Sequence, residues 1–172
     1  LFPYTTLFRS MGGLLMRDIL HKGKHILEGD NPPVLVLQPQ SDIREVRTYL
    51  YRHSYHIVSE SMVYEDGKYY TVILAYPGYE APYEAEEDWE YGRCNIEAGD
   101  SILITYLENE MRVYSEILEK LRPDKGSDKD AVNVPERTRE RIVDIEVKLK
   151  TNRDAYRRCI EVNEMLRDNN NS

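Results

Sequence analysis

Apolar residues recur along the chain with two different spacings, and the change between them divides the sequence into two parts. Between residues 11 and 78, short helical patterns alternate with short apolar runs that are typical of strands. From residue 101 onward, apolar residues recur at three- and four-residue steps over long stretches, which is the spacing of amphipathic helices. The pattern therefore predicts an α/β domain over residues 11–100 and a helical hairpin, or coiled coil, over residues 101–168.

The beginning of the first part predicts two helices around a buried strand. Residues 14–20 carry an apolar helical face that ends at Gly23, and residues 34–37 form a continuous apolar run, as in a central parallel strand. Ser41 is a candidate N-cap for a further helix over residues 43–50, which has apolar residues on one face. This helix is expected to pack on the sheet.

Two β-rich runs, residues 55–64 and 69–76, follow with only a tight turn between them. The turn contains Asp66 and Gly67, a pair that readily adopts the positive φ angles of a two-residue hairpin. Both alternating sets of side chains in the second run are largely apolar, as in a strand between two neighbours. The second strand of this antiparallel hairpin is therefore expected in the interior of the sheet.

The second part predicts two long helices joined by one connection. Residues 77–100 are acidic and aromatic without a clear period, which indicates a long loop with at most a turn of helix. The next helix should stop before Pro123, residues 124–134 should form a polar connection, and the last helix should open at Pro135. Residues 169–172 should fray. The last helix carries a seven-residue repeat at Ile142, Ile145, Leu149, Asn152, Tyr156, Cys159, Asn163 and Leu166.

Composition narrows the class of protein without identifying a reaction. The chain is 41% hydrophobic and 31% charged, has a net charge of −8, and contains no apolar run long enough to span a bilayer. Cys94 and Cys159 lie far apart and outside any metal-binding or disulfide spacing, so we interpret them as reduced thiols of a cytoplasmic protein. His21 and His25 have a helical metal-ligand spacing but no third ligand, so no metal site is expected.

Residues 1–10, Leu-Phe-Pro-Tyr-Thr-Thr-Leu-Phe-Arg-Ser, do not fit the pattern that follows them. They lack the basic start, the continuous apolar core and the cleavage site of a signal peptide. The string resembles the in-frame translation of a sequencing-adapter oligonucleotide. We therefore interpret residues 1–10 as an artefactual tail outside the fold, the alternative being a genuine N-terminal tail that carries no chemistry.

Three short motifs lie in register with the predicted elements. They are Met11-Gly12-Gly13, Leu37-Gln38-Pro39-Gln40 and Glu65-Asp66-Gly67-Lys68-Tyr69-Tyr70. In order and spacing they resemble the tRNA adenine-22 N1-methyltransferase family, TrmK, over residues 11–122 and more loosely into the last helix. In that family a Gly-Met-Gly-Gly turn follows the fourth strand of the sheet, whereas here Ser10 stands in place of the first Gly.

The resemblance implies a fold, an activity and a methyl donor. The fold would be the C-terminal part of a class I, Rossmann-like methyltransferase sheet, cut off before the strands that bind most of the S-adenosylmethionine. The parent enzyme would methylate N1 of an adenine in tRNA, and the truncated chain alone would be inactive. In the family the two motifs rim the pocket where donor and base meet, which singles out Met11, Gly12, Gly13, Gln38, Pro39 and Gln40.

The chemistry of these residues is compatible with such a reaction. Adenine N1 has a lone pair and the donor sulfonium is electrophilic, so the protein must mainly hold the two in line. A glycine turn lets backbone approach a substrate, and Gln38 can offer both a donor and an acceptor to an adenine edge. On residues alone, the favoured interpretation is structural: the glycines make a plain strand-to-helix turn, and Gln38 and Pro39 end a strand.

The last helix is rich in arginine, which allows two interpretations. The side chains could bind tRNA phosphates, or they could form the ordinary charged face of a coiled coil with pairs four residues apart. An alternative function for the whole chain is a non-enzymatic helical hairpin that binds RNA or protein, supported by a small α/β domain. The candidate RNA-binding residues are Arg137, Arg139, Arg141, Arg153, Arg157 and Arg158.

Overall fold

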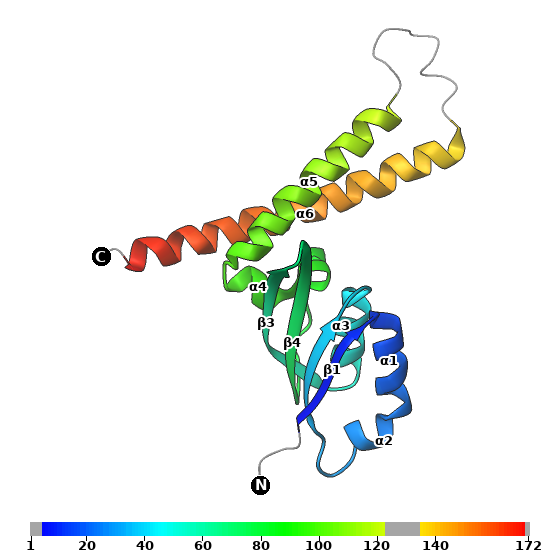
Figure 1. Cartoon of the computed structure of the whole chain (residues 1–172), viewed down its shortest axis with the longest axis vertical. Coiled ribbons are helices and arrows are strands. Elements are labelled where there is room, and N and C mark those ends of the chain that lie inside the picture. The colour runs from blue at the N-terminus through cyan, green and yellow to red at the C-terminus, as the bar shows by residue number, and fades with distance from the viewer. Residues whose placement is uncertain (1–4, 123–134, 171–172) are drawn as a thin grey trace.

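A mixed four-stranded sheet forms the centre of the molecule, as Figure 1 shows for the computed structural model, which describes residues 5–122 and 135–170. The strand order is β1-β2-β4-β3. β1 pairs with β2 in parallel, whereas β4 is antiparallel to both of its neighbours. The strands are β1 (Thr5–Met11), β2 (Val34–Pro39), β3 (Tyr55–Glu65) and β4 (Lys68–Pro77).

Three helices cover one face of this sheet: α1 (Gly13–Lys22), the short α2 (Lys24–Leu27) and α3 (Ile43–Arg52). The apolar face predicted for residues 43–50 is buried against the sheet. The broad face predicted for residues 14–20 is narrower than expected, because Met16 and Leu20 are buried whereas Leu14 and Leu15 are exposed. The resulting core contains Met16, Leu20, Leu27, Leu35, Leu37, Val46, Tyr49, Leu50, Tyr55, Ile57, Ile73 and Ala75.

The predicted β-hairpin is confirmed, including the place of its second strand. Asp66 and Gly67 have φ angles of 51° and 76°, so the turn has the positive φ angles that the Asp-Gly pair predicts. β4 lies between β2 and β3, with Leu37 opposite Ile73 on one side and Ile73 opposite Glu60 on the other. The prediction that the second run is interior is therefore correct.

The N-terminal residues differ from the expectation that residues 1–10 stay outside the fold. Thr5–Met11 forms β1, in register with β2 from Thr5 opposite Val34 to Met11 opposite Pro39. An unpaired edge of β2 would leave backbone N–H and C=O groups without partners, and this segment supplies them while Phe8 packs against the core. The prediction that residues 1–10 lie outside the fold was therefore wrong for the residues of β1, whereas the foreign origin of the decapeptide stays a prediction.

Residues 77–100 are more helical than their sequence suggests. They contain a π-helical turn, η1 (Asp88–Gly92), followed directly by α4 (Arg93–Glu97). The expectation of a loop holds for residues 78–85 and was wrong for residues 86–97, where tertiary contacts hold the helical turns. Arg47 donates hydrogen bonds to the carbonyl oxygens of Trp89 (3.0 Å) and Glu90 (2.8 Å), which no local periodicity could reveal.

Two long helices complete the chain, α5 (Ser101–Leu121) and α6 (Glu136–Asn170). They cross as an antiparallel hairpin at the end of the sheet (Figure 1), as predicted. The side chain of Asp100 caps α5 by accepting hydrogen bonds from the backbone N–H groups of Ile102 (2.8 Å) and Leu103 (2.9 Å). The predicted polar connection, residues 124–134, lies outside the described residues.

The predicted seam of α6 is buried or half-buried from Ile142 to Asn163, which confirms most of the seven-residue repeat. Leu166 is the exception, because its side chain is 47% exposed where α6 extends past its neighbours (Figure 1). α6 runs through Asn170, so the first two of the residues expected to fray, 169 and 170, are helical. Residues 171–172 lie outside the described part of the chain.

The helical hairpin and the sheet share a second apolar core. Met62 from β3 and Tyr91 from η1 pack against Leu103 and Leu107 of α5. Ala155 and Cys159 of α6 close the same cluster, and both are fully buried. The hairpin is therefore fixed to the sheet by packing, and both α5 and α6 contribute side chains to the shared core.

Candidate functional site

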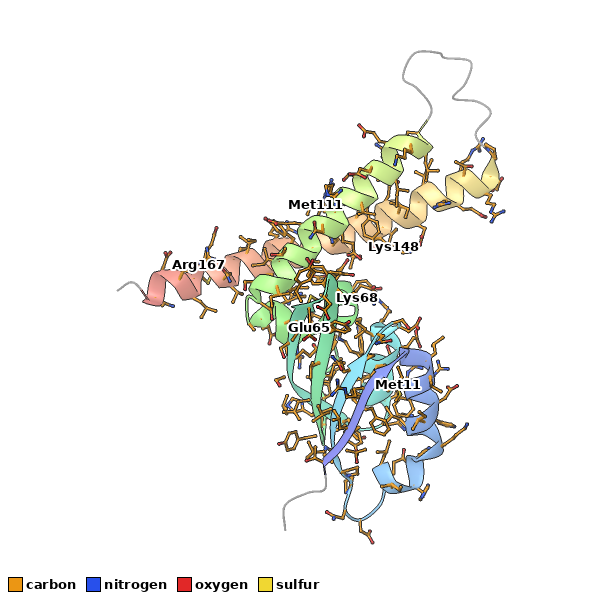
Figure 2. The ribbon with its side chains drawn as sticks, viewed as in Figure 1. Met11, Glu65, Lys68, Met111, Lys148 and Arg167 are labelled. Atoms are coloured by element: carbon orange, nitrogen blue, oxygen red, sulfur yellow. The ribbon has the colours of Figure 1, made fainter. Side chains whose placement is uncertain are left out.

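The two segments that the sequence singles out meet at the carboxyl ends of β1 and β2. The backbone N–H of Gln40 donates to the carbonyl oxygen of Met11 (2.9 Å), and that of Gly13 donates to Ser41 (2.8 Å). Figure 2 labels Met11 at this end of β1. In open α/β sheets, ligands bind outside the carboxyl ends of parallel strands. The structure thus brings both predicted segments to the edge where a ligand is expected.

Gly12 and Gly13 differ in what their missing side chains avoid. A Cβ atom on Gly13 would lie 2.3 Å from the carbonyl oxygen of Ser41 and 2.6 Å from that of Asp42, both of them backbone atoms. A Cβ atom on Gly12 would meet the Ser41 hydroxyl at 3.1 Å. Gly13 is therefore required for the approach of two protein segments to each other, which is a structural reason independent of any substrate.

The glutamines at the end of β2 have unused hydrogen-bonding groups. Gln38 is half-buried and Gln40 is exposed, and neither side-chain amide makes a hydrogen bond among the described residues. Pro39 between them is buried. The two amides can thus present donors and acceptors to a ligand at this edge.

The predicted cap of α3 is wrong. Asp42 occupies the N-cap position, with a left-handed backbone (φ 51°) and no side-chain cap hydrogen bond. Ser41 instead donates its hydroxyl hydrogen to Asp42 Oδ2 (2.7 Å), and its carbonyl oxygen accepts from Gly13. The contact with the glycine turn therefore fixes the backbone of Ser41 at the position before the N-cap of α3, where its side chain does not cap the helix.

A cleft of about 480 Å³ opens beside Gln40, between the start of α3 and the helical hairpin. Three tyrosines, Tyr69, Tyr91 and Tyr106, form its aromatic wall. Tyr69 belongs to the Glu65–Tyr70 motif found in the sequence, whereas no motif or spacing pointed to Tyr91 and Tyr106. The remaining lining residues are Ser41, Asp42, Ile43, Arg44, Glu45, Arg47, Met62, Thr71 and Glu90.

The aromatic wall is held in place by ring contacts and by one carboxylate. The Tyr69 ring lies edge-on to Tyr106, with 5.1 Å between centroids and 70° between planes. Glu110 accepts hydrogen bonds from the hydroxyls of Tyr91 (2.6 Å) and Tyr106 (3.0 Å), and from the amide of Asn152 on α6 (3.1 Å). Burial, reinforced by the Glu110 charge, raises the pKa of Tyr91 and of Tyr106 far above the usual range. Both hydroxyls therefore remain neutral donors.

A buried ion pair supports the floor of the cleft. Arg47, 1% exposed, donates from Nε to Glu60 Oε1 (2.8 Å), while its other nitrogens reach η1. Glu60 Oε2 has no hydrogen-bond partner in the part of the chain that the structure describes, and a Cβ atom on Gly92 would lie 2.1 Å from it. Burial raises the pKa of Glu60, and the charge of Arg47 opposes that rise. The pair fixes η1, which carries Glu90 and Tyr91 of the cleft, against β3.

The six candidate RNA-binding arginines fall into three groups. Arg137, Arg139 and Arg141 are exposed in the first two turns of α6 and make no ion pair among the described residues. Arg153 and Arg157 line a groove of about 1120 Å³ between α5 and α6. The groove also contains Arg122, Lys150, Glu119, Glu146 and Asp154, so its charge is mixed.

Arg158 has a role within the fold. Its guanidinium binds Glu87 (3.0 Å) and Asp88 (2.9 Å) at the start of the π-helical turn. Arg157, one residue earlier, pairs with Asp154 on the same helix. The arginines of α6 therefore include one that joins the helix to the α/β domain, a distinction that the sequence alone did not make.

Other kinds of site find little support among the described residues. No group of three or more metal-ligating side chains lies together in residues 5–122 and 135–170, and no helix there is long and apolar enough to cross a membrane. Cys94 and Cys159 are free thiols, and burial raises the pKa of each to about 11. Neither cysteine is therefore a reactive thiolate near neutral pH.

Comparisons with known proteins agree with the fold and the motifs. The family model described as tRNA (adenine(22)-N(1))-methyltransferase matches residues 6–147. The tRNA (adenine(22)-N(1))-methyltransferase of Bacillus subtilis is 35% identical over 89 residues, which are 52% of this chain and 34% of that protein.

Solved structures show the same fold. An uncharacterised protein from Listeria monocytogenes is 22% identical with a TM-score of 0.77 over 88% of this chain and 62% of its own. TrmK from M. capricolum, in complex with S-adenosylhomocysteine, is 20% identical with a TM-score of 0.71 over 92% of this chain and 62% of its own. The chain thus spans about a third of the curated relative and less than two thirds of these structures.

Proposed function

This chain belongs to the tRNA (adenine(22)-N(1))-methyltransferase family, and we propose that it provides the substrate-facing edge of an enzyme that methylates N1 of an adenine in tRNA. The observation that carries the proposal is the contact between the Met11–Gly13 turn and the end of β2. That contact places the two family motifs side by side at the carboxyl ends of parallel strands. The reaction would take place in front of this edge.

The methyl donor in this proposal is S-adenosylmethionine, whose product S-adenosylhomocysteine is bound by the M. capricolum relative. The residues at the edge fit part of such a ligand, because the amides of Gln38 and Gln40 are free to bind its polar groups. When bound, the donor supplies an electrophilic methyl group on a positively charged sulfur. The remaining contacts would come from regions that the larger relatives have and this chain does not span.

The residues of this chain would orient the adenine without attacking it. Adenine N1 already carries the lone pair that reacts, so an enzyme gains mainly from alignment and from a fixed polar environment. Gln38 and Gln40 can bind the polar edge of the base, while Gly13 keeps the turn close to β2. Arg47 and Glu60 hold η1 beside the cleft and act as positioning residues.

The proposed partner is tRNA in the cytoplasm, and α6 supplies the proposed contact with its phosphates. Arg137, Arg139 and Arg141 are exposed and unpaired among the described residues, so they can bind phosphate without breaking an ion pair. Arg153 and Arg157 lie on a neighbouring groove of mixed charge, where Arg157 is paired with Asp154, so Arg153 is the further candidate for a phosphate contact. Arg158 is left out of the phosphate contact because it already binds Glu87 and Asp88.

The proposal is tested with a chimera in which this chain replaces the matching region of the B. subtilis relative. We expect the chimera to transfer a labelled methyl group from S-adenosylmethionine to tRNA, with 1-methyladenosine as the product seen by mass spectrometry. The 172-residue chain alone should show no turnover. Changing Gln38 and Gln40 together to alanine should lower kcat/KM of the chimera about tenfold or more, as for the loss of aligned hydrogen bonds.

The matched control is Gln40→Glu, which keeps size but removes the amide donors. A folded chimera that binds tRNA but makes no 1-methyladenosine would overturn the proposed reaction. Equal turnover in the double alanine variant and the parent chimera would instead show that the two glutamines do not contribute to the site.

A further inference from the structure

We propose that the tyrosine-walled cleft is a second nucleotide subsite, which holds an unpaired base next to the methylated adenine and stacks it on Tyr69 and Tyr106. The inference rests on the proposed function for the identity of the substrate, and it adds a place for a neighbouring nucleotide. The cleft begins at Gln40, the last of the predicted pocket residues, and continues from there toward the helical hairpin. A nucleotide adjacent in sequence to the reacting one would lie in this direction.

The size and shape of the cleft suit one base. Its volume of about 480 Å³ lies at the lower end of the range for small-ligand sites, roughly 300–1,000 Å³. Tyr69 and Tyr106 are half-buried, so part of each ring faces the cleft. Base stacking on aromatic rings is the usual way in which proteins hold unpaired nucleotides.

The charges of the cleft favour a base over a phosphate. Asp42, Glu45 and Glu90 contribute three carboxylates to its lining, whereas the guanidinium of Arg44 is already paired with Glu86 and Glu90. Carboxylates repel phosphate but accept hydrogen bonds from exocyclic amino groups, which adenine, cytosine and guanine carry and uracil does not. The cleft is therefore suited to an amino-bearing base whose phosphates lie outside it, toward the arginines of α6.

The aromatic wall exists before any ligand binds. Glu110 fixes the hydroxyl of Tyr106, Asn109 donates to the hydroxyl of Tyr69 (3.1 Å), and Asn152 ties Glu110 to α6. Rings that are already immobilised lose little conformational entropy when a base stacks on them. The same contacts connect the subsite with the helix that carries the proposed phosphate-binding arginines.

The test measures binding of the 172-residue chain to tRNA by filter retention, with a double-mutant cycle between protein and RNA. The protein variant is Tyr69→Leu, and the RNA variants carry an abasic nucleotide at either position that flanks adenine 22. We expect each single change to weaken binding about tenfold, and the two together to weaken it little more than one alone. The slope of log Kd against log salt concentration should stay unchanged, because stacking releases no counterions.

Two controls keep the result independent of folding. Tyr69→Phe retains the ring but loses the hydroxyl that Asn109 holds, so it should bind more weakly than the parent and more tightly than Tyr69→Leu. Tyr79→Leu removes a tyrosine that is 81% exposed and outside the cleft, and it should bind as the parent does. Additive losses in the cycle would overturn the subsite, as would a failure of the parent chain to bind tRNA. If Tyr69→Leu weakens binding of S-adenosylhomocysteine and leaves the RNA effects additive, the cleft belongs to the donor and the inference is wrong. None of these outcomes depends on turnover, so loss of the proposed reaction would be seen separately in the chimera.

Discussion

The core under α1 and α3 and the core under the helical hairpin are stabilised in different ways. The first consists of apolar side chains and tyrosines from helices and strands that are close in sequence. The second is bordered by buried polar residues, among them Arg47, Glu60, Asn95 and Asn152. Apolar packing tolerates many arrangements, whereas a buried ion pair or amide requires one partner at one distance. The comparison indicates that apolar packing attaches the hairpin to the sheet, whereas buried polar contacts set the orientation of η1 and of the hairpin.

Breaking the buried ion pair should have the largest effect. Arg47→Met leaves Glu60 charged, buried and unpaired, and we expect a loss of about 4 kcal/mol in the free energy of unfolding, measured by urea denaturation. The double variant Arg47→Met, Glu60→Leu should recover most of this loss because it removes both charges. An equal loss in the single and double variants would show that Arg47 acts mainly through η1.

The same variant should respond to pH in a defined direction. Burial already raises the pKa of Glu60 above its ordinary value of 4.5, and removal of Arg47 takes away the charge that opposes the rise. When the folded-state pKa of a carboxyl lies above its unfolded value, the group contributes to the free energy of unfolding. This contribution is fully present below pH 4.5 and is lost as the pH rises through the folded-state pKa. Arg47→Met should therefore be closest to the parent at pH 4 and furthest from it at pH 8.

Next in size is the glycine contact that closes the edge of the sheet. Gly13→Ala places a Cβ atom within 2.3 Å of the Ser41 carbonyl oxygen, and because the backbone there must move, we expect a loss of about 3 kcal/mol. Gly12→Ala is the matched control, since its Cβ atom meets only a rotatable hydroxyl and should cost less than about 1 kcal/mol. Similar unfolding midpoints for the two variants would contradict the structural reason given for Gly13.

Removing the carboxylate behind the aromatic wall should have a smaller effect. Glu110→Ala leaves the hydroxyls of Tyr91 and Tyr106 and the amide of Asn152 without their acceptor, at an expected cost of about 2 kcal/mol. Glu108→Ala on the same helix removes an exposed acceptor for Tyr156 and should cost less than about 0.5 kcal/mol. If both substitutions change the thermal midpoint equally, Glu110 has no special role.

The start of α6 should affect binding and leave stability unchanged. Changing Arg137, Arg139 and Arg141 together to glutamine should weaken tRNA binding about tenfold or more and lower the salt slope by about 2 to 3. Removing three positive charges from Lys22, Lys24 and Arg52, which are exposed on the α/β domain, should change the slope by less than 1. Equal slopes in both triple variants would indicate that only net charge matters.

Much of the sheet and the hairpin could be predicted because apolar periodicity determines them. The run at 34–37, the Asp66-Gly67 turn and the seam from Ile142 to Asn163 each follow from local pattern. Leu166 continues the repeat but is 47% exposed, since a seven-residue pattern does not say where the partner helix ends.

The predictions failed where a distant residue decides the local structure. Arg47 holds the π-helical turn from 42 residues away, through its hydrogen bond to Trp89. No spacing within residues 77–100 predicts this turn. The strand at Thr5–Met11 depends on the unpaired edge of β2, and the backbone of Ser41 depends on Gly13. The predicted pocket segments do meet, but the cleft beside them needed Tyr91 and Tyr106. These two tyrosines come together through Glu110, through their own ring contact and through the apolar core under the hairpin.

The length of α6 sets a fixed distance between the cleft and the arginines at the start of the helix. Asn152 contacts α5 beside the cleft, and Arg137 to Arg141 lie 11 to 15 residues earlier on the same helix, which corresponds to roughly 16–22 Å at the rise of an α-helix. An RNA that occupies the cleft must therefore extend by this much before its backbone reaches the arginines. Substrate size would thus be selected by the reach of one rigid helix, so a short stem-loop would present the right base yet lose the second point of attachment.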